Sequence, residues 1–121
     1  MSLFGTPATS RHAREKPFSI GSQELTDIDA RIRDLDKFGI DTQIINSTLL
    51  NATLSPDVEF EYALCHAYNT WVREMCEQSS GRLRWNAMLR LTHIEKALEE
   101  LQRVEALGAA AVEIHGMAGD K

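Results

Sequence analysis

Three amphipathic helical patterns alternate with three short apolar runs along this chain, and this alternation restricts its fold more than any other feature. The first helical pattern runs from Leu25 to Phe38, with apolar residues recurring every three or four positions and charged residues between them. A start signal lies at Thr26 and Asp29, and Gly39 supplies the left-handed residue that commonly ends a helix. The run 40–46 is β-branched and bounded by turn-forming residues, which predicts a strand.

The second helical pattern begins at Ser55, which we interpret as the N-cap, followed by a proline and an acidic residue in the first turn. The pattern extends to Gln78, where the turn-forming residues 79–81 end it. The apolar stripe that we expect to face the core comprises Phe60, Leu64, Ala67, Trp71 and Met75. The next apolar run, 83–89, predicts the second strand.

The third helical pattern opens with Thr92-His93-Ile94-Glu95, which matches a capping box with Thr92 as the N-cap, and it ends at Gly108. Its expected buried stripe comprises Ile94, Leu98, Leu101 and Leu107, with Ala97 and Val104 beside them. The small and β-branched residues 109–115 predict a third, buried strand. The expected order of elements is therefore α-β-α-β-α-β.

This order predicts an α/β fold of parallel β/α units, the kind of unit from which TIM barrels are built. A complete (β/α)₈ barrel needs about 250 residues, with a lower limit near 200. With 121 residues, the chain is too short for a complete barrel and accounts for part of a TIM-barrel-like fold. Residues 1–22 show no periodicity and are expected to form an N-terminal arm, whereas 23–121 form the partial barrel domain.

A sheet of three parallel strands would carry its helices on one face and leave the other face and both edges open. Such surfaces mark interaction sites or aggregation hazards. We therefore expect a homo-oligomer. The corresponding alternative function is that of a non-catalytic, self-associating α/β module.

Composition excludes several classes of function. The chain has 18 acidic and 13 basic residues, which argues against nucleic-acid partners. No apolar stretch is long enough to span a membrane, and the N-terminus lacks a signal-peptide pattern, so we expect a cytoplasmic protein. Cys65 and Cys76 belong to no metal or redox motif and are expected to be reduced and structural.

Ligands in β/α folds bind at the carboxyl ends of the strands. Asn46, Thr48 and His115 occupy these positions and are the candidate substrate-facing residues. The alternative interpretation is that Asn46 and Thr48 only form a turn and that His115 only hydrogen-bonds the backbone. No two histidines have metal-ligand spacing, and no phosphate-loop or nucleophile-elbow motif occurs, so the catalytic residues remain unknown and no metal ligand is predicted.

Several segments resemble the amidohydrolase-2 family, which comprises aminocarboxymuconate-semialdehyde-decarboxylase-like, metal-dependent hydrolases and decarboxylases. The clearest is RIRDLDKFGIDTQII at 31–45. Further similar segments follow in the family's order: AYNTW at 67–71, GRLRW at 81–85, ALEEL at 97–101, and 107–120. The resemblance covers about residues 25–121.

This resemblance implies a (β/α)₈ barrel that holds a divalent metal such as zinc and hydrolyses or decarboxylates a small-molecule substrate. The family's HxH metal pair would lie upstream of this chain, and its later metal ligands beyond Lys121. We therefore expect a fragment that lacks the family's metal ligands, holds no cofactor and is inactive alone. A further alternative is a metal site shared between copies, built from His115 with His12 or His66.

Overall fold

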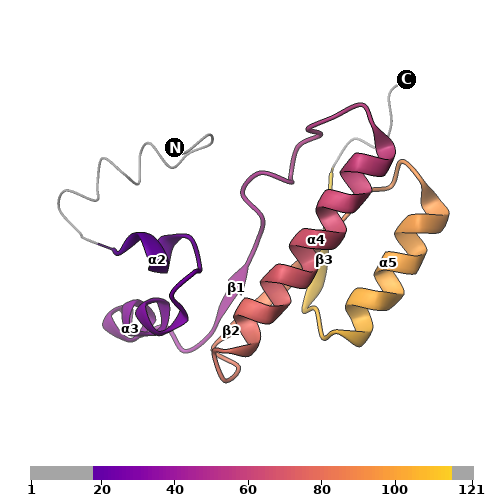
Figure 1. The fold of residues 1–121 in the computed structure, drawn as a ribbon. Helices are drawn as coiled ribbons and strands as arrows, with labels where there is room; N and C mark the ends of the chain where they lie inside the picture. The colour runs from indigo at the N-terminus through magenta and orange to yellow at the C-terminus, as the bar shows by residue number, and fades with distance from the viewer. Residues whose placement is uncertain (1–17, 116–121) are drawn as a thin grey trace.

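The computed structural model describes residues 18–115 (Figure 1), so residues 1–17 of the expected arm lie outside the described part. Three strands, β1 (Gln43–Ile45), β2 (Leu83–Leu89) and β3 (Ala111–Ile114), form one parallel sheet in the order β1-β2-β3. The helices are α2 (Ile20–Gln23), α3 (Ile28–Phe38), α4 (Val58–Glu77) and α5 (Ile94–Ala106). The predicted α/β class and the alternation of helices and parallel strands are confirmed.

The two long helices, α4 and α5, lie side by side on the same side of the sheet (Figure 1). β1 pairs only with the first part of β2, from Gln43↔Leu83 to Ile45↔Trp85. β3 pairs with the second part, beginning at Asn86↔Ala111. The carboxyl half of β2 therefore lacks β1 as a neighbour, and a side chain of α4 hydrogen-bonds the backbone there instead.

That side chain is Asn69, which is fully buried. Its Oδ1 accepts a hydrogen bond from the Met88 backbone N–H at 2.7 Å, and its Nδ2 donates to the Met88 carbonyl at 2.9 Å. Nδ2 also donates to Oε1 of Glu100 at 2.9 Å. One amide thus joins α4, β2 and α5.

The main core lies between the sheet and the helices and comprises Leu25, Ile28, Leu35, Val72, Cys76, Leu83, Trp85, Ala87 and Val104. A second group of buried residues, here called the loop cluster, consists of Leu50, Cys65 and Met88. It lies where the β1–α4 loop, residues 46–57, meets α4 and the end of β2. No helix in the described range 18–115 is long and apolar enough to cross a membrane.

The apolar stripe predicted for α4 is wrong in part. The buried face consists of Glu61, Cys65, Asn69, Val72 and Cys76. Phe60 is 50% exposed and Trp71 is also exposed, whereas Leu64 and Met75 are half-buried against the core. The buried face is rotated by about one residue, because two of its positions carry polar side chains whose hydrogen bonds are made inside the protein.

The stripe predicted for α5 is wrong in part for the same reason, although Ala97 and Val104 are buried and Leu107 packs against the main core as expected. Ala97, Glu100 and Val104 are buried, whereas the apolar residues Ile94 and Leu98 are more than half exposed. Glu100 occupies the centre of the buried face. Because the prediction counted only apolar residues, it assigned this carboxylate to the exposed side of the helix. The exposed side of α5 thus keeps an apolar stripe, Ile94, Leu98 and Leu101, that contacts no core cluster among residues 18–115.

The predicted N-caps, Thr26, Ser55 and Thr92, are each one or two residues early. The N-caps are Asp27, Asp57 and His93, whose side chains accept hydrogen bonds from backbone amides of the first turn. Each start contains two neighbouring residues able to cap a helix, and sequence alone does not decide between them. Helix α2, capped by Ser19, lies where the sequence predicted the arm to continue to residue 22.

The end of α3 carries a stability prediction. Gly39 has φ +66°, and the following amide, of Ile40, donates to the Leu35 carbonyl at 3.0 Å. A Cβ at Gly39 would meet no atom within 4 Å, so an added side chain causes no clash. The destabilisation then comes only from holding a non-glycine residue at positive φ. We expect Gly39→Ala to lower the free energy of unfolding by about 1–2 kcal/mol, measured by urea denaturation. Gly39→Asn should lose less, and an alanine variant as stable as the parent would contradict this account.

Candidate ligand site at the carboxyl edge of the sheet

The three predicted substrate-facing residues lie where the strands end. Asn46 follows β1 directly and is exposed, and its Oδ1 accepts a hydrogen bond from Nδ2 of Asn86 at 2.8 Å. Thr48 is exposed in the same loop, and His115 is half-buried immediately after β3. Because the strands are parallel, all three belong to the same edge of the sheet. Contact with a substrate stays a prediction.

Sequence reasoning missed the charged pair that dominates this edge. Oε2 of Glu61, in the first turn of α4, accepts a hydrogen bond from Nε of Arg90, which follows β2, at 2.7 Å. Both side chains are buried, with 4% and 6% of their surfaces exposed. The only sequence signal was an arginine directly after a buried strand, which is equally typical of a solvated loop.

This pair fastens the β1–α4 loop. Oε1 of Glu61 accepts hydrogen bonds from the backbone amides of Leu54 at 2.7 Å and Ser55 at 2.8 Å. Nη2 of Arg90 donates to the Ala52 carbonyl at 2.8 Å. The loop that carries Thr48 is therefore held to both α4 and the end of β2.

The charges around the loop shift the ionisation of their neighbours. Burial acts to raise the pKa of Glu61, but the hydrogen bonds from Arg90 and from two backbone amides outweigh it and leave that pKa below its ordinary value. Burial raises the pKa of Cys65 to about 11, an effect that nearby Arg90 only partly offsets. Burial likewise raises the pKa of Cys76 to about 11. Both cysteines are free and buried, which confirms the prediction of reduced, structural thiols.

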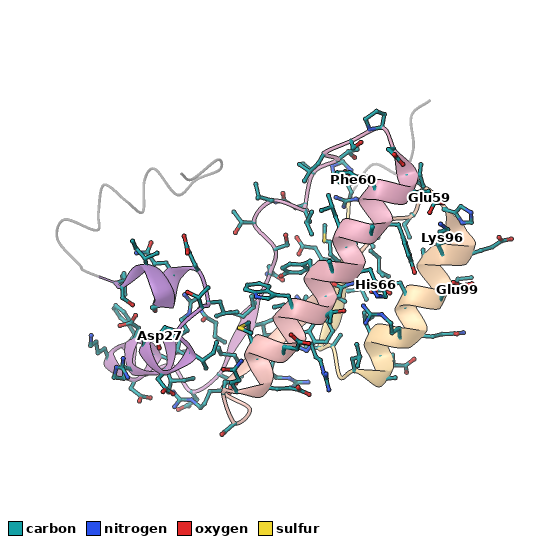
Figure 2. All side chains as sticks on the ribbon, in the orientation of Figure 1. Asp27, Glu59, Phe60, His66, Lys96 and Glu99 are labelled. Carbon is teal, nitrogen blue, oxygen red and sulfur yellow. The ribbon has the colours of Figure 1, made fainter. Side chains whose placement is uncertain are left out.

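A second polar network joins α4 to α5. Figure 2 shows His66 of α4 pointing toward α5, where its Nδ1 lies 2.9 Å from Oε2 of Glu100. Arg103 donates to both carboxylate oxygens of Glu100, at 2.8 and 2.7 Å, and Asn69 donates to one. Closer to the N-termini of the two helices, Lys96 forms an ion pair with Glu59. The Glu100 carboxylate therefore has its hydrogen-bonding capacity used within the protein.

The described residues do not fit a divalent metal. Within residues 18–115, no three histidine, cysteine or acidic side chains gather into a group that could hold one. In the contact between His66 and Glu100, the carboxylate already accepts hydrogen bonds from Arg103 and Asn69. No step of chemistry is therefore assigned to a metal in this part of the chain.

The two buried glutamates lead to a pH prediction. Burial acts to raise the pKa of Glu100, and the hydrogen bonds from Arg103, Asn69 and His66 reverse this, so its pKa, like that of Glu61, is lowered on folding. The unfolded chain then binds more protons than the folded one as pH falls past the ordinary glutamate value of about 4.3. Stability should be full above that value and decline as pH falls through the lowered folded values.

Urea midpoints between pH 7 and pH 3 measure this decline. Glu100→Gln should make the decline shallower, because one of the buried glutamates whose pKa is lowered on folding is gone. Glu99→Gln, at an exposed neighbouring position, is the matched control and should leave the slope unchanged. A midpoint that stays constant down to pH 3 would show that these carboxylates are not linked to folding.

Comparison with known proteins gives a partial match. No family model matches the chain. No curated protein matches it either. Two crystal structures, 2,6-dihydroxybenzoate decarboxylase from Rhizobium and 2,6-dihydroxybenzoate decarboxylase complexed with 2,6-dihydroxybenzoate, match with a TM-score of 0.64 and 29% sequence identity.

The match covers 77% of this chain but only 29% of the decarboxylase chain, so this chain spans less than a third of the length of the proteins it resembles. The matched part consists of parallel β/α units, as in a partial TIM-barrel-like fold. At this level of identity, the likeness supports the amidohydrolase superfamily that the sequence segments indicated.

Proposed function

We propose that this chain supplies consecutive β/α units of a metal-dependent decarboxylase or hydrolase barrel that acts on a small carboxylate, and that it is inactive alone. The observation that carries the proposal is the match of its parallel units to 29% of a decarboxylase chain at 29% identity. The segments of sequence that resemble the amidohydrolase-2 family lie on these same units.

The uncovered surfaces of the structure support a role within a larger barrel. Val112 and Ile114 of β3 are 41% and 50% exposed, and the apolar stripe of α5 is exposed as well. All-parallel sheets are normally covered on both faces and continue into further strands. A following β/α unit would pack against α5 and β3 and cover these residues.

In the completed barrel, Asn46, Thr48 and His115 would face the substrate from the carboxyl edge. Asn46 and Thr48 carry short polar groups that suit hydrogen bonding, and His115 can transfer a proton. The metal ligands would come from other units, because residues 18–115 contain no set of their own.

Zinc content and decarboxylation of 2,6-dihydroxybenzoate test the proposal. After incubation with zinc and dialysis, the chain alone should retain less than stoichiometric metal, and the absorbance of 2,6-dihydroxybenzoate should not change. Replacing the matching segment of the Rhizobium decarboxylase with residues 25–121 should give a chimera that holds zinc and releases carbon dioxide. One bound zinc per chain alone, or a folded chimera without zinc, would contradict the proposal.

The exposed stripe of α5 also favours the alternative, a module that associates with copies of itself. Ile94, Leu98 and Leu101 recur at helical spacing on one side of α5, and Leu98 is 53% exposed. Light scattering should then give a mass above that of the monomer. Leu98→Glu should shift the mass to the monomer, whereas Gln102→Glu, also exposed on α5, should not. A monomer at all concentrations would reject this alternative.

A further inference from the structure

Arg90 is a buried cation with an unused donor. It lies directly after β2, and only 6% of its side chain is exposed. Two of its nitrogens hold contacts already described, with Glu61 and with Ala52. Its third nitrogen, Nη1, is buried and has no hydrogen-bond partner within residues 18–115. A buried donor left in this state is unfavourable, so the arrangement needs an explanation.

The two existing contacts orient the guanidinium and leave the N–H donors of Nη1 without an acceptor among residues 18–115. Glu61 accepts from Nε at 2.7 Å and the Ala52 carbonyl accepts from Nη2 at 2.8 Å. These bonds fix the rotamer and the plane of the group, which leaves the two N–H donors of Nη1 directed to one side. An arginine fixed in this way is arranged in advance to receive an acceptor oxygen.

The position favours a ligand as the source of that oxygen. Parallel β/α sheets bind their ligands at the carboxyl ends of the strands, and Arg90 directly follows the central strand of this sheet. The loop that covers Arg90 is the one that carries Thr48, and Asn46 begins it. Leu50 of this loop packs with Cys65 and Met88, so the loop is also anchored beside the end of β2 by apolar contacts.

We propose that Arg90 is a ligand-binding residue, in which Nη1 donates to an oxygen of a small carboxylate while Glu61 and the Ala52 carbonyl hold the guanidinium in place. Because Nη1 is buried, residues 46–51 of the β1–α4 loop move aside for the carboxylate to enter, while Ala52 keeps its contact with Nη2. The inference depends on the proposed function only for the choice of an aromatic carboxylate as the probe. It is tested in the chain alone, so its outcome is separate from the zinc and decarboxylation measurements.

Glu61 sets the strength of this interaction. Its negative charge compensates Arg90, so the bound carboxylate meets a nearly neutral pair and binds modestly. Removing the charge while keeping the shape should therefore strengthen binding. If the pair is purely structural, Glu61→Gln should not strengthen carboxylate binding, because the substitution would then only loosen the β1–α4 loop.

Titration of the full chain with benzoate, followed by calorimetry and by NMR of the arginine Nε–H groups, tests the proposal. Benzamide, which has the same ring and no charge, is the matched ligand control. Benzoate should shift the Arg90 Nε–H signal, and benzamide should not. Arg90→Lys should weaken benzoate binding about tenfold, because lysine keeps the charge but loses the planar fork. Arg84→Lys, on the exposed face of the same strand, should leave binding unchanged.

Circular dichroism first establishes that each variant is folded. If Arg90→Lys does not fold, Glu61→Gln and the Arg90 signal of the unsubstituted chain still decide the matter. Tighter benzoate binding by Glu61→Gln would support the proposal. An Arg90 signal that ignores benzoate, equal shifts with benzamide, or benzoate binding that Arg90→Lys leaves unchanged would each overturn it.

Discussion

Replacing Asn69 with alanine is expected to lower the free energy of unfolding by about 2–5 kcal/mol, because two buried backbone groups of Met88 would lose their partner. Within residues 18–115, β1 does not extend far enough to replace Asn69 on this side of β2, since it pairs only up to Ile45↔Trp85 and β3 lies on the opposite side. Glu100 would lose a donor at the same time. Urea denaturation monitored by circular dichroism measures the loss.

Glu74→Ala is the matched control for Asn69→Ala. Glu74 lies on the same helix and is exposed, so its replacement should change stability by less than about 0.5 kcal/mol. Asn69→Asp keeps the shape of the side chain but places a second carboxylate beside Glu100, and it should be destabilising as well. An alanine variant within 0.5 kcal/mol of the parent, on the scale expected for surface changes, would show that α4 does not hold β2 through this amide.

The elements themselves were predictable from local pattern. The expected second strand, 83–89, is β2 with the same bounds, and Gly39 ends α3 in the left-handed conformation as predicted. These features depend on a few neighbouring residues: β-branched and apolar side chains, or a glycine that tolerates positive φ. The alternation of such elements then sufficed for the parallel α/β class.

Which face of each helix is buried was not predictable in the same way. Glu61, Asn69 and Glu100 occupy buried positions because their partners come from distant parts of the chain. Periodicity counts apolar residues and assigns polar ones to solvent, so it placed Phe60 and Leu98 in the core, where neither is found. A polar side chain is buried only where hydrogen-bond partners are available inside the protein, and those partners are brought together by the tertiary structure.

The same distinction applies to the candidate site, where some residues were predictable from local sequence and others were not. Asn46, Thr48 and His115 were identified because strand ends can be located from sequence, and they lie at the expected edge. Arg90 was visible as a residue at a strand end, but its burial depends on Glu61, 29 positions away, and on Ala52 of the β1–α4 loop, 38 positions away. Contacts between residues so far apart in sequence cannot be detected from the local sequence pattern.

The strongest test of what Glu61 and Arg90 contribute is a double substitution. Arg90→Met should cost about 3–5 kcal/mol, because the Glu61 carboxylate would remain buried without its counter-charge. Adding Glu61→Gln should recover much of that loss, since a glutamine oxygen can still accept from the Leu54 and Ser55 amides and carries no charge. The double variant is therefore expected to be more stable than Arg90→Met alone, as judged by denaturant midpoints.

The Arg73–Glu77 pair provides the comparison, because it lies on α4 with more than half of the Glu77 side chain exposed. Arg73→Met should cost less than about 1 kcal/mol, and adding Glu77→Gln should recover nothing measurable. If the buried double variant approaches the parent in stability, the fold does not require the charges of Glu61 and Arg90. Their place at the carboxyl edge would then be accounted for by the carboxylate that Arg90 is proposed to bind. If the double variant is no better than Arg90→Met, the loss comes from packing and loop contacts of the arginine, and the pair is structural.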